Sequence, residues 1–228
     1  MTNLFKPISI YFFGSLIWLT IATFLANGNA YIYFGMMLIW FLGILTMEIK
    51  HNKSLFSNDW EVLKGHKAKN IILIIIGLII LQLVVSISGD FFRQFVSEKS
   101  HFPTYSFPIN TWLGIFMNLL VGLISVIIAF FEEVAYRYEL FYKFKNKSII
   151  TFISLLLLSS FLFGASHIYN FNGSILGTLS YASAGLILGL FYIISKNIWV
   201  PIIIHVLFNS VALIAPIFIL LFKIKSLF

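Results

Sequence analysis

The sequence predicts an all-α membrane protein, a polytopic transmembrane helix bundle with about seven spans. Two observations carry this prediction: 60% of the 228 residues are hydrophobic, and only 10% are charged. A soluble domain has roughly 25% charged residues, because its surface must be hydrated. The charges are also unevenly spread, since residues 70–89, 111–131, 148–195 and 197–222 contain none. Uncharged stretches of about 20 residues match the thickness of a hydrocarbon core, which excludes a soluble enzyme and a disordered or fibrous protein.

The spans are expected to be helices, because the apolar stretches lack the period-two alternation that a membrane barrel requires. We place the helices at residues 8–26, 30–47, 70–88, 111–136, 148–167, 174–195 and 198–222. Turn-forming residues separate neighbouring helices at Asn27-Gly28-Asn29, at 170–173 and at Lys196-Asn197. The basic C-terminal tail leaves room for an eighth segment, extra or re-entrant. Residues 48–69 and 89–110 are the only substantial loops between spans.

The distribution of basic residues predicts the orientation. Lys and Arg gather in the loops that stay on the cytoplasmic side of a membrane. With the N-terminus inside, ten of them fall in cytoplasmic loops and four fall outside. Topology therefore explains the net charge of +7, and nothing resembles a nucleic-acid-binding surface. The absence of cysteine excludes disulfides, thiol catalysis and Cys-ligated metals.

Glu132, Glu133 and Arg137 end the fourth predicted span, where lipid makes charge costly. A charge at the bilayer centre costs roughly 2.5–3.5 kcal/mol, so it is kept when it is paired, hydrated or functional. Arg137 follows Glu133 by four residues, which puts both on one helix face in the favourable order. Glu132 is rotated by about 100° and has less local compensation, as a general base or acid requires. The alternative is a surface ion pair at a helix end.

His167 ends the fifth predicted span, after the small residues Gly164, Ala165 and Ser166. Small residues let neighbouring helices approach closely. His167 is therefore a candidate metal ligand or proton carrier. The alternative is a hydrated histidine at the membrane interface.

His205 and Asn209 lie in the last predicted span, four residues apart and thus on one helix face. Their side chains suit a ligand, a proton carrier or an oxyanion partner. The alternative is an interhelical hydrogen bond that stabilises the bundle by about 0.6 kcal/mol.

Together, these three elements resemble the motif set of the CPBP family of intramembrane proteases (CaaX proteases and bacteriocin-processing enzymes, also called Abi). The family pattern is Glu-Glu-x-x-x-Arg, then Phe-x-x-x-His, then His-x-x-x-Asn or Asp. The chain carries it in order on separate helices, as Glu132-Glu133…Arg137, Phe163…His167 and His205…Asn209. The resemblance divides the chain into N-terminal helices and loops (1–110), a catalytic core (111–215) and the end of the last span with a basic tail (216–228).

The resemblance implies an intramembrane endopeptidase. In this family Glu132 would activate water, and His167 would assist as a proton carrier or ligand. His205 and Asn209 would stabilise the oxyanion, and the Glu133–Arg137 pair would hold the first carboxylate in place. The family is conventionally called a metalloprotease, and Glu132, His167 and His205 could give Zn²⁺ three ligands and an open position. The same residues suit a metal-free glutamate mechanism, so both alternatives stay open.

These side chains can form one site only if they lie at a similar depth in the membrane. Counted from the cytoplasmic ends of their helices, Glu132 lies about 18 Å deep, His167 about 29 Å and His205 about 10 Å. Upright helices cannot bring these depths together. Tilted helices, a break near Gly164 or different helix ends are required.

The expected reaction is hydrolysis of a peptide bond in a hydrophobic peptide or a membrane-associated protein, within the lipid bilayer and with no nucleic acid. A composition rich in Ile, Phe, Asn and Lys resembles proteins of AT-rich Gram-positive bacteria, where bacteriocin or pheromone processing or self-immunity is favoured over prenylated substrates. The alternatives are a non-proteolytic immunity or regulatory protein of the same fold and a proton-coupled transporter. The lack of an evident inverted repeat disfavours the transporter.

Overall fold

The computed structural model describes residues 8–97 and 107–225. These residues are 86% helical and contain no strand. Within them, five helical stretches are long and apolar enough to cross a membrane: Ile8–Ala26, Ala30–His51, Lys67–Phe95, Trp112–Phe144 and Trp199–Lys225. Two further apolar helices, α7 (Ile149–Ala165) and α8 (Leu179–Ser195), have 17 residues each and fall just short of that length. The predicted all-α polytopic bundle is confirmed.

The N-terminal part is a helical hairpin of α2 (Ser15–Ala26) and α3 (Ala30–His51), preceded by a π-helical segment, η1 (Ile8–Gly14). The predicted turn lies between the two helices. Asn27 and Gly28 have φ angles of 43° and 83°, in the left-handed region that Gly and Asn tolerate best. The side chain of Asn29 then caps the first turn of α3.

Residues 48–69 are not an open loop. They contain a further helix, α4 (Lys53–Gly65), whose side chains are mostly polar. Its buried Phe56 ring packs against Phe130 and Trp199, with ring centroids 5.4 Å and 5.7 Å away. A polar helix with one buried aromatic residue is typical of a segment that lies at the surface of a bundle. The chain then enters α5 (Lys67–Phe92), which packs on α8 and on α9 (Trp199–Lys225) and is followed by a 3₁₀ turn, η2 (Arg93–Phe95).

The fourth predicted span extends further than the sequence indicates. Helix α6 (Trp112–Glu132) passes directly into a π-helical segment, η3 (Glu133–Glu139), before a 3₁₀ turn, η4 (Tyr142–Phe144). The wider winding frees backbone carbonyls from their usual partners. Ser159 of α7 donates a hydrogen bond to one of these, the buried carbonyl of Tyr136. The π segment therefore begins beside the two carboxylates and is held by the neighbouring helix.

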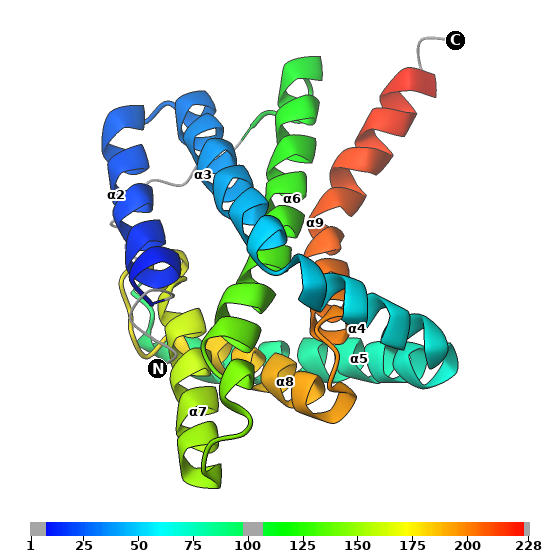
Figure 1. Cartoon of the computed structure of the whole chain (residues 1–228). Helices are drawn as coiled ribbons and strands as arrows, with labels where there is room; N and C mark the ends of the chain where they lie inside the picture. The colour runs from blue at the N-terminus through cyan, green and yellow to red at the C-terminus, as the bar shows by residue number, and fades with distance from the viewer. Residues whose placement is uncertain (1–7, 98–106, 226–228) are drawn as a thin grey trace.

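The helices do not share one direction. Figure 1 shows α2, α3, α6 and α9 running up and down the view, whereas α5 and α8 cross them at a steep angle. The first turn of α7 also lies well below the first turn of α9 in this view. Helices α7 and α9 begin within one residue of the predicted spans but at different heights in this view, so residue counts from their first turns do not measure a common depth. The orientation with the N-terminus inside stays a prediction. Two of the counted basic residues, Lys6 on the cytoplasmic side and Lys99 on the outside, lie outside the described residues.

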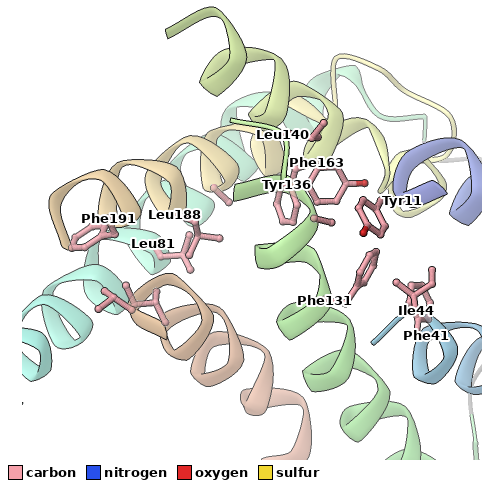
Figure 2. Close-up of a cluster of buried hydrophobic side chains, with 14 of the residues drawn as sticks. Tyr11, Phe41, Ile44, Leu81, Phe131, Tyr136, Leu140, Phe163, Leu188 and Phe191 are labelled. Atoms are coloured by element: carbon pink, nitrogen blue, oxygen red, sulfur yellow. The ribbon is translucent and has the colours of Figure 1, made fainter. Parts of the chain in front are cut away.

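The main buried cluster lies around the C-terminal end of α6 and the following η3, and joins them to both halves of the chain. Figure 2 shows Phe131 between Tyr11 and Phe41, whose ring centroids are 5.8 Å and 5.7 Å away. On the other side, Tyr136 meets the ring of Phe163 from α7 edge to face at 5.7 Å. Phe131 and Tyr136 flank the two carboxylates in the sequence. The packing that fixes these aromatic rings thus fixes the backbone that carries the candidate site.

Candidate active site

Glu133 and Arg137 form a completely buried ion pair. The guanidinium Nε lies 3.1 Å from Oε2 of Glu133, and both side chains are 0% exposed. The guanidinium carbon also lies 4.3 Å from the centre of the Phe163 ring, in a cation–π contact. The predicted pairing is confirmed, and the alternative of a surface ion pair is wrong. Two charges without water are stable only as a pair, so each fixes the position of the other.

Glu133 also holds His205, the histidine of α9. Nδ1 of His205 lies 2.8 Å from Oε1 of Glu133. Because Oε1 of the carboxylate paired with Arg137 acts as the acceptor, Nδ1 is assigned as the donor. In the neutral ring the lone pair is therefore on Nε2, which lies 4.0 Å from Oε2 of Glu132. Glu133 thus orients the imidazole while Glu132 faces its opposite edge.

His167 approaches Glu132 from the turn that follows α7. Its Nδ1 donates to the carbonyl oxygen of Phe163 at 2.9 Å, which again leaves the lone pair on Nε2. Nε2 lies 3.6 Å from Oε1 of Glu132, beyond hydrogen-bond length. Phe163 therefore contributes twice, because its carbonyl fixes the His167 tautomer and its ring packs against both histidines at 5.0 Å and 5.7 Å.

The position of His167 depends on close contact between α7 and α8. A Cβ atom on Gly164 would lie 2.5 Å from the carbonyl oxygen of Thr178 and 2.7 Å from the backbone nitrogen of Ala182. Only glycine permits this approach, as the run of small residues predicts. After Ala165 the helix ends, and Asn172 and Gly173 reverse the chain with φ angles of 51° and 84°.

Asn209 lies one turn beyond His205 on α9. Its Nδ2 donates to the carbonyl oxygen of Ser125 on α6 at 3.0 Å. The carboxamide carries two hydrogens, so one is left for another acceptor. Both residues of this motif thus make interhelical hydrogen bonds, as the structural alternative expected.

Glu132, His167, His205 and Asn209 all line one cavity of about 440 Å³. Glu132 is almost fully buried, and among the described residues its carboxylate accepts no hydrogen bond. Its oxygens face two imidazole nitrogens across gaps of 3.6 Å and 4.0 Å. The carboxylate and the two Nε2 lone pairs are therefore placed to share a small polar molecule such as water.

The cavity has walls that the sequence did not indicate. Tyr33, Met37 and Phe41 of α3 close it on one side, although the N-terminal half carried no motif. The ring of Tyr181 from α8 stands edge to face with His167 at 4.8 Å. Ser125 precedes Glu132 by seven residues, so helical periodicity could have placed it on the same face. No local sequence feature marks the three α3 residues or Tyr181 as cavity residues, because they reach the cavity only when their helices pack across the bundle.

The side chains predicted to bind zinc are Glu132, His167 and His205. Two imidazole Nε2 atoms and a carboxylate are donor types that Zn²⁺ uses, and each Nδ1 is held by an acceptor as in zinc sites. In residues 8–97 and 107–225, however, no group of three or more His, Cys, Asp or Glu is arranged to hold a metal ion. The side chains as placed do not form a metal site. Zinc binding stays a prediction, and no step of the proposed reaction is derived through a metal.

A helical membrane bundle with one carboxylate and two imidazoles around a cavity has the groups that an intramembrane hydrolase requires. Comparison with known families agrees. Residues 114–211 are similar to the family model described as Type II CAAX prenyl endopeptidase Rce1-like. The chain has no match among curated proteins or among solved structures.

Proposed function

We propose that the chain is an intramembrane endopeptidase in which Glu132 activates water to cleave a peptide bond in a hydrophobic peptide or a membrane-associated protein. The single observation that carries the proposal is the shared cavity, where Glu132 faces the Nε2 atoms of His167 and His205. The family match supports the class of reaction.

The first step places water between the carboxylate and the imidazoles. Glu132 takes a proton from this water while the water oxygen attacks the scissile carbonyl carbon, forming a tetrahedral oxyanion. His167, held by the Phe163 carbonyl, accepts a hydrogen bond at Nε2 from the second hydrogen of the water and so orients the attack. When the carbon–nitrogen bond breaks, Glu132 returns its proton to the departing amine.

The oxyanion needs donors that are already in place. Asn209 supplies its second amide hydrogen, because the first is engaged by Ser125. His205 supplies Nε2–H when it is protonated, and the carboxylate of Glu133 at 2.8 Å stabilises that imidazolium. One well-placed donor of this kind is worth about 10²–10³ in turnover.

The cavity lining favours an uncharged substrate segment. Apart from Glu132 and the two histidines, it is lined by uncharged side chains, with Leu, Met, Phe, Val, Ile and Ala residues making up the greater part. Away from Glu132, a charged side chain of a substrate would lose its hydration there without a partner. Together with the composition rich in Ile, Phe, Asn and Lys, this lining favours as substrate a bacteriocin, a pheromone peptide or its leader, or a membrane protein of a Gram-positive producing cell, in processing or self-immunity.

Purified protein in lipid nanodiscs, incubated with a library of apolar peptides in H₂¹⁸O, tests the proposal. We expect cleavage products with one ¹⁸O in the new carboxylate, and a turnover at least about 10²-fold lower in Glu132→Gln. Glu61→Gln is the matched control, because Glu61 is exposed and its ion pair with exposed Lys64, at 2.7 Å, lies outside the cavity. Wild-type cleavage by Glu132→Gln would overturn the mechanism.

Two other results would point to the alternative functions. If variants of Glu132, His167 and His205 all keep the cellular phenotype, the chain acts as a non-proteolytic immunity or regulatory protein. Proton-coupled flux into sealed vesicles, lost in the same variants, would indicate a transporter.

A further inference from the structure

Helix α4 is bonded to the start of α9, the helix that carries His205. Oδ2 of Asp59 accepts a hydrogen bond from the backbone N–H of Ile198 at 2.7 Å. The carbonyl oxygen of Asp59 accepts a second from Nδ2 of Asn197 at 2.6 Å. Asn197 and Ile198 are both 0% exposed. These bonds join segments that lie 138 and 139 residues apart in the sequence, so they are tertiary contacts.

Trp199 adds a third bond and most of the packing at the same place. Its indole Nε1 donates to the carbonyl oxygen of Phe56 at 2.9 Å. Its ring lies 5.1 Å from the ring of Trp60 and 5.7 Å from that of Phe56. The first residue of α9 is therefore enclosed by α4 on several sides.

The first N–H groups of a helix have no partner within the helix. At the start of α9 two backbone N–H groups have acceptors outside the helix: that of Ile198, the residue just before α9, bonds to Asp59, and that of Trp199, the first residue, bonds to Oδ1 of Asn197 at 3.0 Å. A carboxylate is also favoured at this end by the helix dipole. Asp59 thus supplies a side-chain acceptor to a backbone N–H at the start of α9, as an N-cap residue does, although it belongs to another helix.

The first two turns of α9 transmit this constraint. Val200, Ile202 and Ile204 are 0–2% exposed, and His205 is 6% exposed. A helix is stiff along its axis, so a shift of the Ile198 end by a fraction of an ångström moves the His205 ring by a similar amount. The bond from Nδ1 of His205 to Glu133 is 2.8 Å long and would be stretched by such a shift.

We propose that Asp59 is a positioning residue of the peptidase, which caps α9 from the surface helix α4 and so holds His205 against Glu133. This role rests on the proposed function, since it concerns the turnover of that same site. Asp59 does not touch the substrate cavity, so its removal should lower kcat with little change in KM.

The test compares Asp59→Ala, Asp59→Asn and Glu61→Ala in nanodiscs. Asp59→Asn keeps an acceptor for the Ile198 N–H, whereas Asp59→Ala removes it. Glu61→Ala removes a carboxylate from the same helix without touching α9. We expect kcat to fall about five- to tenfold in Asp59→Ala, the range for a lost N-cap acceptor, and to stay near the wild-type value in the other two.

Hydrogen–deuterium exchange of residues 196–205 provides a readout that needs no cleavage. Asp59→Ala should speed exchange in this peptide by about five- to tenfold, and Asp59→Asn should restore slow exchange. Trp199→Phe removes the bond to the Phe56 carbonyl and reduces the ring packing against α4, and it should speed exchange in the same peptide even if Asp59→Ala does not fold.

The outcomes separate the two proposals. Unchanged exchange in Asp59→Ala overturns the positioning role. If the alanine variant does not fold, unchanged exchange in Trp199→Phe contradicts the hold of α4 on the start of α9, on which that role depends. An equal loss of kcat in Glu61→Ala also overturns it, because the effect would then be one of charge on α4. If wild-type protein cleaves nothing, the proposed function fails, while the exchange data still decide whether Asp59 fixes the start of α9.

Discussion

The buried pair of Glu133 and Arg137 allows a quantitative test of how the site is held together. The two variants are Glu133→Gln and Arg137→Met, which nearly preserve side-chain volume, and the double variant combines them. Both side chains are 0% exposed, and Nε lies 3.1 Å from Oε2. At an effective dielectric constant of about 20, the Coulomb attraction at this distance is about 5 kcal/mol.

Each single variant leaves one buried charge without its partner. Glu133→Gln should be the more destabilising of the two, because it leaves the Arg137 charge unpaired and the two terminal amino groups of Arg137 already lack hydrogen-bond partners among the described residues. We expect each single substitution to lower the free energy of unfolding by about 3–5 kcal/mol. The double variant should lose much less than the sum, because it removes both charges and the desolvation that they required.

The assay is unfolding of the detergent-solubilised protein, followed by circular dichroism during titration with a denaturing detergent. Peptide cleavage by the same samples adds a second readout. The double variant should fold well and still cleave poorly, because His205 has lost the carboxylate that orients Nδ1. Single variants that cost less than about 1 kcal/mol, or effects that simply add, would refute the view that the pair acts as one unit.

Three further results are expected. Gly164→Ala should lower the free energy of unfolding by about 1–3 kcal/mol and reduce cleavage, because the added Cβ would lie 2.5 Å from the backbone oxygen of Thr178. Gly43→Ala is the control, since its Cβ would have no atom within 4 Å, and thermal unfolding compares the two variants. Burial raises the pKa of the Asp59 carboxyl above 3.8, and this effect exceeds the opposite effects of the Ile198 hydrogen bond and of Lys145. The protonated carboxyl therefore contributes its full share to the free energy of unfolding below pH 3.8, and this share is lost as the pH rises through the raised pKa. Asp59→Asn should therefore match wild type below about pH 4 and melt at a higher temperature at about pH 8, and equal melting at both would contradict this. A glutamate mechanism predicts turnover that survives 1,10-phenanthroline, whereas chelator-sensitive turnover restored by Zn²⁺ would establish the zinc site.

Much of the candidate site follows from short-range sequence features. The spacing of Glu133 and Arg137 places them on one face, and the structure confirms their contact. Their complete burial was not predictable, because it depends on Phe163 and on the π-helical winding of residues 133–139. The surface helix α4 was not predicted as a helix either, since its few apolar residues acquire a partner only when Trp199 packs against them.

The sequence by itself determined the class of fold, the positions of the apolar helices and the order of the polar motifs, because these depend on local hydrophobicity, turn residues and spacing. Tertiary structure alone decided that His167 and His205 meet at Glu132 from helices that start at different levels. It also decided that Asp59 caps a helix 139 residues away. The physical reason is that helix position is a property of each segment in lipid, whereas crossing angle and depth are set by which side chains and glycines let the helices touch.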